Sequence, residues 1–168
     1  MTGEGARSAQ DVAIDVLSRL RVRGESLAVA ESCTGGGLGA ILTSVPGASA
    51  AFVGGVIAYS DSVKVSLLGV APATLTSHGA VSRESSLQMA DGVREILAAD
   101  WGVSITGIAG PDGGSRAKPV GTVFIGLSGP DLEFGERFRF PGEREEVRTA
   151  AAWAALDLLA RSVKRTDV

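Results

Sequence analysis

The chain has 168 residues, a hydrophobic content of 45% and a formal net charge of −3. This length suits one domain with one substantial core. Its apolar runs are all shorter than the roughly 18 residues of a membrane helix, and its acidic balance gives no general attraction to nucleic acid phosphates. We therefore expect a globular protein that binds neither a membrane nor nucleic acid.

The first half of the chain reads as alternating helices and strands. Its N-terminal residues, MTGEGARSAQD, contain no apolar core of a signal peptide, so we expect a cytoplasmic protein. Apolar spacing and glycine stop signals then predict a helix over 10–21, a buried strand over 27–30, a helix from about residue 38, a strand over 52–59 and a short helix over 61–68.

The second half adds a strand, a hairpin and two long helices. The pattern predicts an irregular segment over 70–81, a helix over 83–99, a strand over 101–109, a loop over 110–115, antiparallel strands over 120–127 and 132–140, and a helix over 143–163. This order, without repeats or a linker, predicts one α/β domain over 1–168. We expect a three-layer α/β/α sandwich with a mixed sheet, frayed at 1–8 and 164–168.

The Gly-rich stretch after the first predicted strand is open to several interpretations. A strand, a tight turn and a helix start leave N–H groups free to bind an anion or an oxyanion. Residues 35–40 also fit the dinucleotide fingerprint G-x-G-x-x-A, but 32–60 contain no Asp or Glu to bind the ribose. The P-loop and nucleophile-elbow patterns are absent. An ordinary Gly-rich connection is the simplest alternative.

Two nucleophiles, Ser32 and Cys33, stand at the start of this turn. Cys33 is the single cysteine and His78 the single histidine, which excludes an internal disulfide, a multi-cysteine metal site and the two-histidine metal motifs. Cys33 and His78 can form a thiolate–imidazole dyad, although a small buried cysteine is the simpler interpretation of Cys33. We expect no metal.

A second candidate set of catalytic residues consists of Ser32, Tyr59 and Lys64. The sequence has three lysines against thirteen arginines, which favours a role for Lys64 that arginine cannot perform, such as losing its proton when buried. A neutral lysine can activate a serine hydroxyl, and the ends of two strands can bring the three residues together. The alternative is a half-buried tyrosine and a solvated lysine.

Several long motifs resemble one known family. They are AESCTGG at 30–36, YSDSVK at 59–64, HGAVS at 78–82, SITGIAGPDGGS at 104–115, KPVGTV at 118–123 and FPGEREEVR at 140–148. In these motifs the chain resembles the C-terminal domain of the competence/damage-inducible CinA proteins, which also occurs as stand-alone nicotinamide-nucleotide amidases of the PncC type. The motifs span nearly the whole chain.

The resemblance implies a CinA C-terminal-domain-like fold and the deamidation of nicotinamide mononucleotide to nicotinic acid mononucleotide and ammonia, in pyridine nucleotide salvage, without a cofactor. Its catalytic serine, tyrosine and lysine correspond to Ser32, Tyr59 and Lys64. Asp61 stands where the family usually has Asn, and Asp is itself a good helix cap. We also expect a homo-oligomer, with a dimer favoured.

The working hypothesis assigns roles around Ser32. Neutral Lys64 deprotonates Ser32, Tyr59 relays or orients the proton, and the turn after Ser32 cradles the oxyanion or the phosphate. The loop from Thr106 to Ser115 closes over the nucleotide, and Arg144 or Arg148 meets the phosphate. The residues expected to bind substrate are Glu31, Thr34, Gly35, Gly36, Thr106, Gly107, Gly110 and Arg144.

A function of another class fits the same sequence. CinA proteins commonly carry an additional N-terminal domain that resembles molybdenum-cofactor-binding proteins, and this domain is not part of the sequence. The alternative expectation is therefore a non-catalytic module that senses a nucleotide or binds a partner. Tight nucleotide binding without turnover distinguishes it from the amidase.

Overall fold

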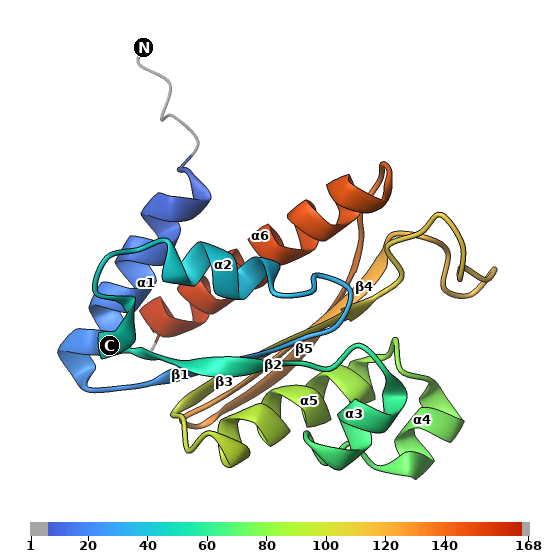
Figure 1. Cartoon of the computed structure of the whole chain (residues 1–168), viewed down its shortest axis with the longest axis horizontal. Helices are drawn as coiled ribbons and strands as arrows, with labels where there is room; N and C mark the ends of the chain where they lie inside the picture. The colour runs from blue at the N-terminus through green and yellow to red at the C-terminus, as the bar shows by residue number, and fades with distance from the viewer. Residues whose placement is uncertain (1–6, 166–168) are drawn as a thin grey trace.

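A computed structural model of the chain describes residues 7–165 (Figure 1). Its elements are α1 (Ala9–Arg23), β1 (Leu27–Glu31), α2 (Gly37–Thr43), a 3-10 turn (Ala48–Ala50), β2 (Phe52–Ile57), α3 (Asp61–Ser66), α4 (Pro72–His78), α5 (Arg83–Ile96), β3 (Trp101–Gly107), β4 (Thr122–Gly129), β5 (Leu132–Arg139) and α6 (Arg144–Arg165). None of these helices is both long enough and apolar enough to cross a membrane.

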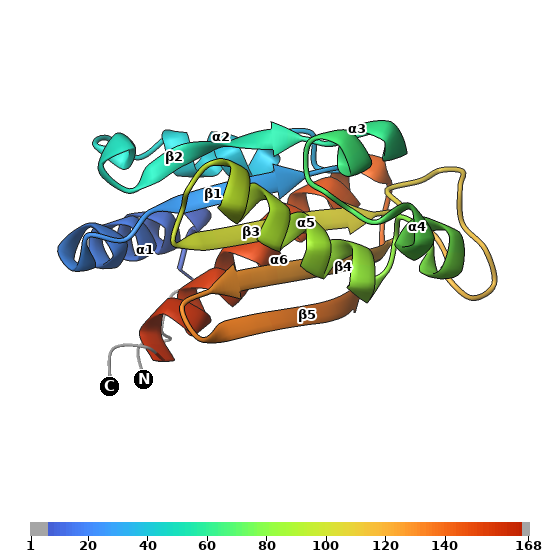
Figure 2. The same ribbon diagram turned by 90° about the horizontal axis from the view of Figure 1, so that it is seen from below.

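The five strands form one mixed sheet in the order β2-β1-β3-β4-β5. Strands β2, β1 and β3 are parallel, whereas β4 runs antiparallel to both of its neighbours. Helices α1, α2 and α6 cover one face, and α3, α4 and α5 cover the other (Figures 1 and 2). The predicted three-layer α/β/α sandwich with a mixed sheet is confirmed.

The strand β1 is the centre of the parallel part of the sheet. All five of its residues are buried, because β2 and β3 flank it and helices cover both of its faces. The core on the α1, α2 and α6 side contains Leu27, Val29 and Trp101, and the core on the α5 side contains Ala28 and Met89. Successive side chains of β1 therefore point alternately into two separate cores, one on each face of the sheet.

Helix α5 lies directly on the sheet because two glycines let it approach. A Cβ atom at Gly102 of β3 meets the backbone oxygen of Ala90, and a Cβ atom at Gly126 of β4 meets that of Ser86. Only residues without a side chain allow this close contact between a helix and a strand.

Most predicted elements are confirmed, with shifts at their ends. The irregular segment expected over 70–81 is wrong in part, because Pro72 begins helix α4; proline suits the first turn of a helix, where its missing N–H needs no partner. Strand β2 ends at Ile57, β3 at Gly107 and α5 at Ile96, each two or three residues before the predicted end.

Fraying was expected over 1–8 and 164–168, but Ser8, Lys164 and Arg165 are ordered parts of helix ends. The Ser8 side chain caps α1 in a capping box, and Lys164 and Arg165 belong to α6. Residues 1–6 and 166–168 lie outside the described range.

Candidate active site

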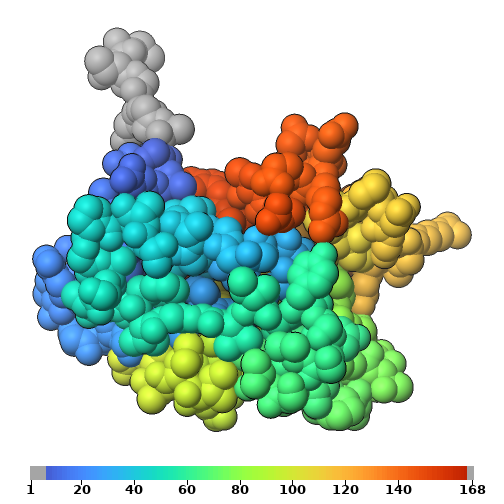
Figure 3. Space-filling model, in the orientation of Figure 1, coloured from blue at the N-terminus to red at the C-terminus, as the bar shows by residue number. Residues whose placement is uncertain are grey.

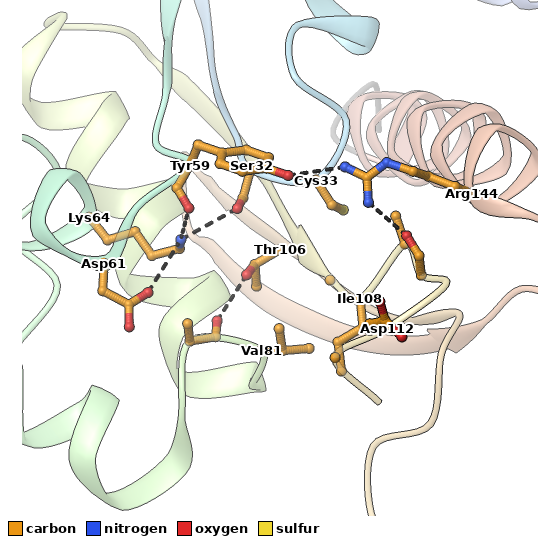
Figure 4. Close-up of a pocket in the computed structure, with 15 residues that line it drawn as sticks. Ser32, Cys33, Tyr59, Asp61, Lys64, Val81, Thr106, Ile108, Asp112 and Arg144 are labelled. Carbon is orange, nitrogen blue, oxygen red and sulfur yellow. Dashed lines mark hydrogen bonds and ion pairs between the residues drawn. The ribbon is translucent and has the colours of Figure 1, made fainter. Parts of the chain in front are cut away.

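The candidate site lies where the carboxyl ends of β1, β2 and β3 meet. In a parallel sheet these ends share one edge, where ligands commonly bind. Ser32 follows β1, Tyr59 lies two residues beyond β2, and the segment beginning at Ile108 follows β3. Figure 4 shows these residues around one cavity of about 280 Å³.

Lys64 and Ser32 are neighbours in this cavity. The Lys64 Nζ atom lies 3.4 Å from Ser32 Oγ and 3.4 Å from the backbone oxygen of Tyr59. It also lies 3.7 Å from Asp61 Oδ1. The short helix α3, capped by the Ser60 side chain, presents Lys64 to Ser32.

The lysine is almost completely buried. Lys64 is 2% exposed, so the interpretation of a solvated lysine is wrong. Burial lowers its pKa below the ordinary value, because desolvation disfavours the ammonium, and the nearby Asp61 carboxylate partly opposes this shift. A lysine with a lowered pKa beside a serine hydroxyl is suited to act as a base.

The cavity brings together most of the predicted site residues. Ser32, Tyr59, Lys64, Thr106, Gly107, Gly110 and Arg144 all line it, together with Cys33, Asp61, Ala80, Val81, Ile108, Ala109, Asp112 and Gly113. The Thr106 hydroxyl donates to the backbone oxygen of Ala80 at 2.9 Å, which ties β3 to the segment before α5. Thr34, Gly35, Gly36 and Glu31 do not line the cavity.

Glu31 has a structural position rather than a substrate-facing one. Glu31 is 1% exposed, and its carboxylate accepts hydrogen bonds from the Thr34 hydroxyl at 2.6 Å and from the N–H groups of Gly36, Leu38 and Gly39 at 3.2, 3.1 and 2.8 Å. The anion site at the start of α2 is thus occupied by the protein's own carboxylate, and substrate binding by Glu31 and Gly36 stays a prediction.

The other groups of the turn are also engaged. The Gly35 N–H donates to the backbone oxygen of Ser32 at 3.1 Å, and the Thr34 hydroxyl donates to the Glu31 carboxylate. Arg148 donates to the backbone oxygens of Cys33 and Thr34 at 3.1 and 3.2 Å. Of the predicted cradle of Thr34, Gly35 and Gly36, only the Thr34 N–H donates to no other residue within 7–165, and the neighbouring Cys33 N–H is in the same position.

Tyr59 contributes two different groups to the site. Its backbone oxygen faces Lys64, whereas its side chain is 62% exposed and its hydroxyl accepts from Arg144 at 3.0 Å. Arg144 also donates to the Gly110 oxygen at 2.7 Å. The predicted proton relay through the phenol is not supported, because the phenol contacts neither Ser32 nor Lys64 (Figure 4).

The thiolate dyad is also contradicted. Burial raises the pKa of the Cys33 thiol to about 11, since the thiolate loses its hydration. His78 does not line the cavity, and its Nδ1 lies 3.6 Å from a carboxylate oxygen of Glu84. Cys33 fits the interpretation of a small buried residue beside the turn.

Two features of the site were not found in the sequence. Asp61 was considered only as a helix cap, yet its carboxylate contacts Lys64. Ala80 and Val81 come from the segment before α5 and carry no chemical signal of their own. Within residues 7–165, no group of three or more His, Cys, Asp or Glu side chains is arranged to hold a metal ion.

Comparisons with known proteins agree with the fold and the motifs. A profile of the CinA C-terminal domain matches residues 9–163. A CinA-like protein of a Synechococcus strain is 56% identical over 146 residues, which is 86% of this chain and 35% of that protein. One from a Cyanothece strain is 55% identical over 159 residues, covering 93% and 38%. The chain thus spans a little more than a third of these relatives.

Solved structures are similar over nearly the full length. A CinA superfamily protein from Klebsiella pneumoniae has a TM-score of 0.90 and 33% identity, with 95% of this chain and 99% of that chain covered. A competence/damage-inducible protein from Agrobacterium tumefaciens has a TM-score of 0.90 and 34% identity, with 97% and 99% covered.

Proposed function

The chain belongs to the CinA C-terminal domain family, and from this premise and the geometry of Ser32 and Lys64 we propose that it is an amidohydrolase. The proposed reaction converts nicotinamide mononucleotide to nicotinic acid mononucleotide and ammonia, in pyridine nucleotide salvage. The observation that carries the proposal is the buried Lys64 Nζ, 3.4 Å from Ser32 Oγ. Its lowered pKa favours the neutral amine that a base requires.

The first half of the reaction forms an ester on Ser32. Lys64 takes the proton from Ser32 Oγ as that oxygen bonds to the carboxamide carbon. The carbon–nitrogen bond then breaks, and the Lys64 ammonium returns the proton to the nitrogen, which leaves as ammonia. The Tyr59 backbone oxygen holds Nζ on its other side, so the amine stays directed at Ser32.

The second half hydrolyses this ester. Water attacks the acyl carbon, Lys64 accepts its proton and passes it to Ser32 Oγ, and the carboxylic acid is released. The N–H groups of Cys33 and Thr34 are the candidate donors to the oxyanion in both halves, because they follow Ser32 and the other N–H groups of the turn are engaged.

Arg144 is the proposed contact for the phosphate. It lines the cavity and carries a guanidinium suited to bind phosphate oxygens with two nitrogens. Its present partners are a backbone oxygen and a phenol, both neutral acceptors that a charged phosphate can replace. Arg144 is preferred to Arg148 for this role, because Arg148 does not line the cavity and donates to the backbone oxygens of the turn after Ser32.

The test is ammonia release from nicotinamide mononucleotide, compared with release from nicotinamide riboside, nicotinamide and glutamine, each assayed separately. We expect Ser32→Ala to lower kcat by at least about 10³-fold. Lys64→Arg keeps the charge but supplies no neutral base, and we expect a loss of about 10²-fold or more. Lys164→Arg in α6 is the matched control and keeps full activity.

Two outcomes decide against the proposal. Full turnover by Ser32→Ala removes Ser32 as the nucleophile. Tight binding of the nucleotide by the wild type without any ammonia release favours the alternative, a nucleotide-sensing module, over the amidase.

A further inference from the structure

An arginine of α6 binds the backbone of the turn after Ser32. Arg148 donates through Nε to the backbone oxygen of Cys33 at 3.1 Å and through Nη2 to that of Thr34 at 3.2 Å. Its third nitrogen, Nη1, donates to a carboxylate oxygen of Glu145 at 2.6 Å. The space-filling view shows the start of α6, in orange-red, against the blue segment that joins β1 to α2 (Figure 3). Two of the three guanidinium nitrogens therefore hold the turn, and the third holds an acid of the same helix.

The residues from Ser32 to Gly35 form a tight turn with a middle peptide that Arg148 contacts. The Gly35 N–H donates to the backbone oxygen of Ser32, and neither Cys33 nor Thr34 has a positive φ, as in a type I turn. The hydrogen bond that closes such a turn joins its first and last residues, so it leaves the middle peptide, between Cys33 and Thr34, free to rotate. The carbonyl oxygen of this peptide is the one that Arg148 binds through Nε. The arginine therefore fixes a rotation that the turn itself does not fix.

The same peptide carries the Thr34 N–H. A trans peptide is planar, and its C=O and N–H point in opposite directions. Because the Cys33 oxygen points to Arg148, the Thr34 N–H points away from it. In turns that begin with serine, the N–H two residues on faces the serine side chain, which is the geometry of the ST turn. The Thr34 N–H thus lies on the side of Ser32 Oγ, and it donates to no acceptor within residues 7–165.

We propose that Arg148 is a positioning residue, which holds the Cys33–Thr34 peptide so that the Thr34 N–H donates to the acyl oxygen when Ser32 attacks. The inference rests on the proposed reaction at Ser32 but not on which amide is the substrate. Negative charge develops on the acyl oxygen during the attack, and a donor directed in advance at that oxygen stabilises the transition state.

The guanidinium has a second effect on this donor. A charged donor on the C=O polarises the peptide, which makes its N–H a stronger hydrogen-bond donor. Lysine does not reproduce the contact, because the planar fork of arginine places two nitrogens on two neighbouring carbonyl oxygens at once.

Backbone dynamics test the positioning without any substrate. We expect the ¹⁵N order parameter of the Thr34 N–H to be about 0.85 in the wild type and to fall below about 0.6 in Arg148→Met, which keeps the apolar stem and loses the donors. Glu145→Gln is the matched control: it removes the ion pair on Nη1 and leaves both bonds to the turn, so the Thr34 N–H stays rigid. A rigid Thr34 N–H in Arg148→Met overturns the inference, whether or not the chain releases ammonia.

Kinetics test the effect on the reaction. Loss of one oxyanion donor costs about 10²–10³-fold in kcat, so we expect Arg148→Met, in which the donor is misdirected, to lower kcat at least about 10-fold with KM within about 2-fold. Glu145→Gln is expected to keep the wild-type kcat and KM. Circular dichroism at the assay temperature verifies the fold. An unchanged kcat in folded Arg148→Met, or a loss confined to KM, refutes the role, because a residue that only stabilises the fold does not change kcat of the folded enzyme.

A p-nitrophenyl acetate assay separates this inference from the proposed substrate. Ser32 Oγ bonds to the acetyl carbon as nitrophenolate leaves, the proton of Oγ passes to Lys64, and water then releases acetate and restores the hydroxyl. The acetyl oxygen becomes the same oxyanion, so we expect Arg148→Met to slow nitrophenolate release at least about 10-fold, after subtraction of the Ser32→Ala rate.

The outcomes of the two assays are distinguishable. Nitrophenolate without ammonia contradicts the nucleotide substrate, and the ester rates then decide for or against Arg148. A wild type that releases neither product overturns both the reaction and the inference. If Arg148→Met does not fold, Arg148→Lys replaces it in all three measurements with the same expected directions, because it keeps the charge and lacks the fork.

Discussion

Glu31→Gln tests whether the buried carboxylate holds the turn that carries Ser32. In the wild type, Oε2 accepts from Thr34, Gly36 and Leu38, and Oε1 accepts from Gly39. In Gln an NH₂ group replaces one of the two carboxylate oxygens. The backbone N–H that donated to that oxygen then faces another donor and has no acceptor. An orphaned buried donor costs about 1–3 kcal/mol, and loss of a negative charge at a helix start costs about 0.3–1 kcal/mol.

We therefore expect Glu31→Gln to lower the free energy of unfolding by about 1–4 kcal/mol. Urea unfolding, followed by circular dichroism, measures this as a lower midpoint at unchanged slope. Glu145→Gln is the control: Glu145 pairs with Arg148, but its side chain is 78% exposed, so we expect a change of at most about 0.5 kcal/mol.

Activity adds a second measurement to this experiment. At a temperature where Glu31→Gln remains folded, we expect kcat to fall, because the turn shifts Ser32 away from Lys64. A Gln variant within about 0.5 kcal/mol of the wild type refutes the reasoning. The hydrogen bonds to Glu31 then contribute nothing net, and the carboxylate does not organise the turn.

Three further predictions concern the groups around Ser32. Asp61→Asn removes the negative charge that raises the pKa of Lys64, so that pKa falls and the acid limb of the kcat/KM profile moves to lower pH; a move to higher pH contradicts the role of Lys64 as base. Cys33→Ser is expected to release ammonia as the wild type does and to resist iodoacetamide equally, since the thiol has a pKa of about 11; an inactive Cys33→Ser reopens the thiolate mechanism. Tyr59→Phe loses the bond to Arg144 but keeps the carbonyl at Lys64, so KM is expected to rise about 2–10-fold at constant kcat; a loss confined to kcat supports the phenol relay instead.

The sequence predicted the parts of the site that depend on topology. Apolar runs identified β1 and β2, and the carboxyl ends of parallel strands meet at one edge. That rule alone brings Ser32 and Tyr59 together, and the short connection to α3 brings Lys64 with them. The scarcity of lysine led to the expectation of a buried amine at Lys64, a role that arginine does not fill, and the burial is confirmed.

The sequence did not predict which atoms meet. Glu31 is the last residue of a strand buried on both faces, and nothing in LAVAE shows that its side chain turns back to the start of α2. For Tyr59, the motif identified the residue but not that its carbonyl, rather than its phenol, faces Lys64. These details follow from side-chain direction and backbone rotation, which sequence spacing does not determine.

The uncharged run from 32 to 60 also explains how Lys64 is tuned. Glu31 and Asp61 are the acidic residues on either side of that run. Glu31 is bound to the turn, whereas Asp61 is the one carboxylate within ion-pair distance of Lys64 among residues 7–165. Because Asp61 is the main group that opposes the effect of burial, we expect one substitution at 61 to move the pH at which the amine becomes neutral. Asp61 is thus the position with the most direct control over the proposed base.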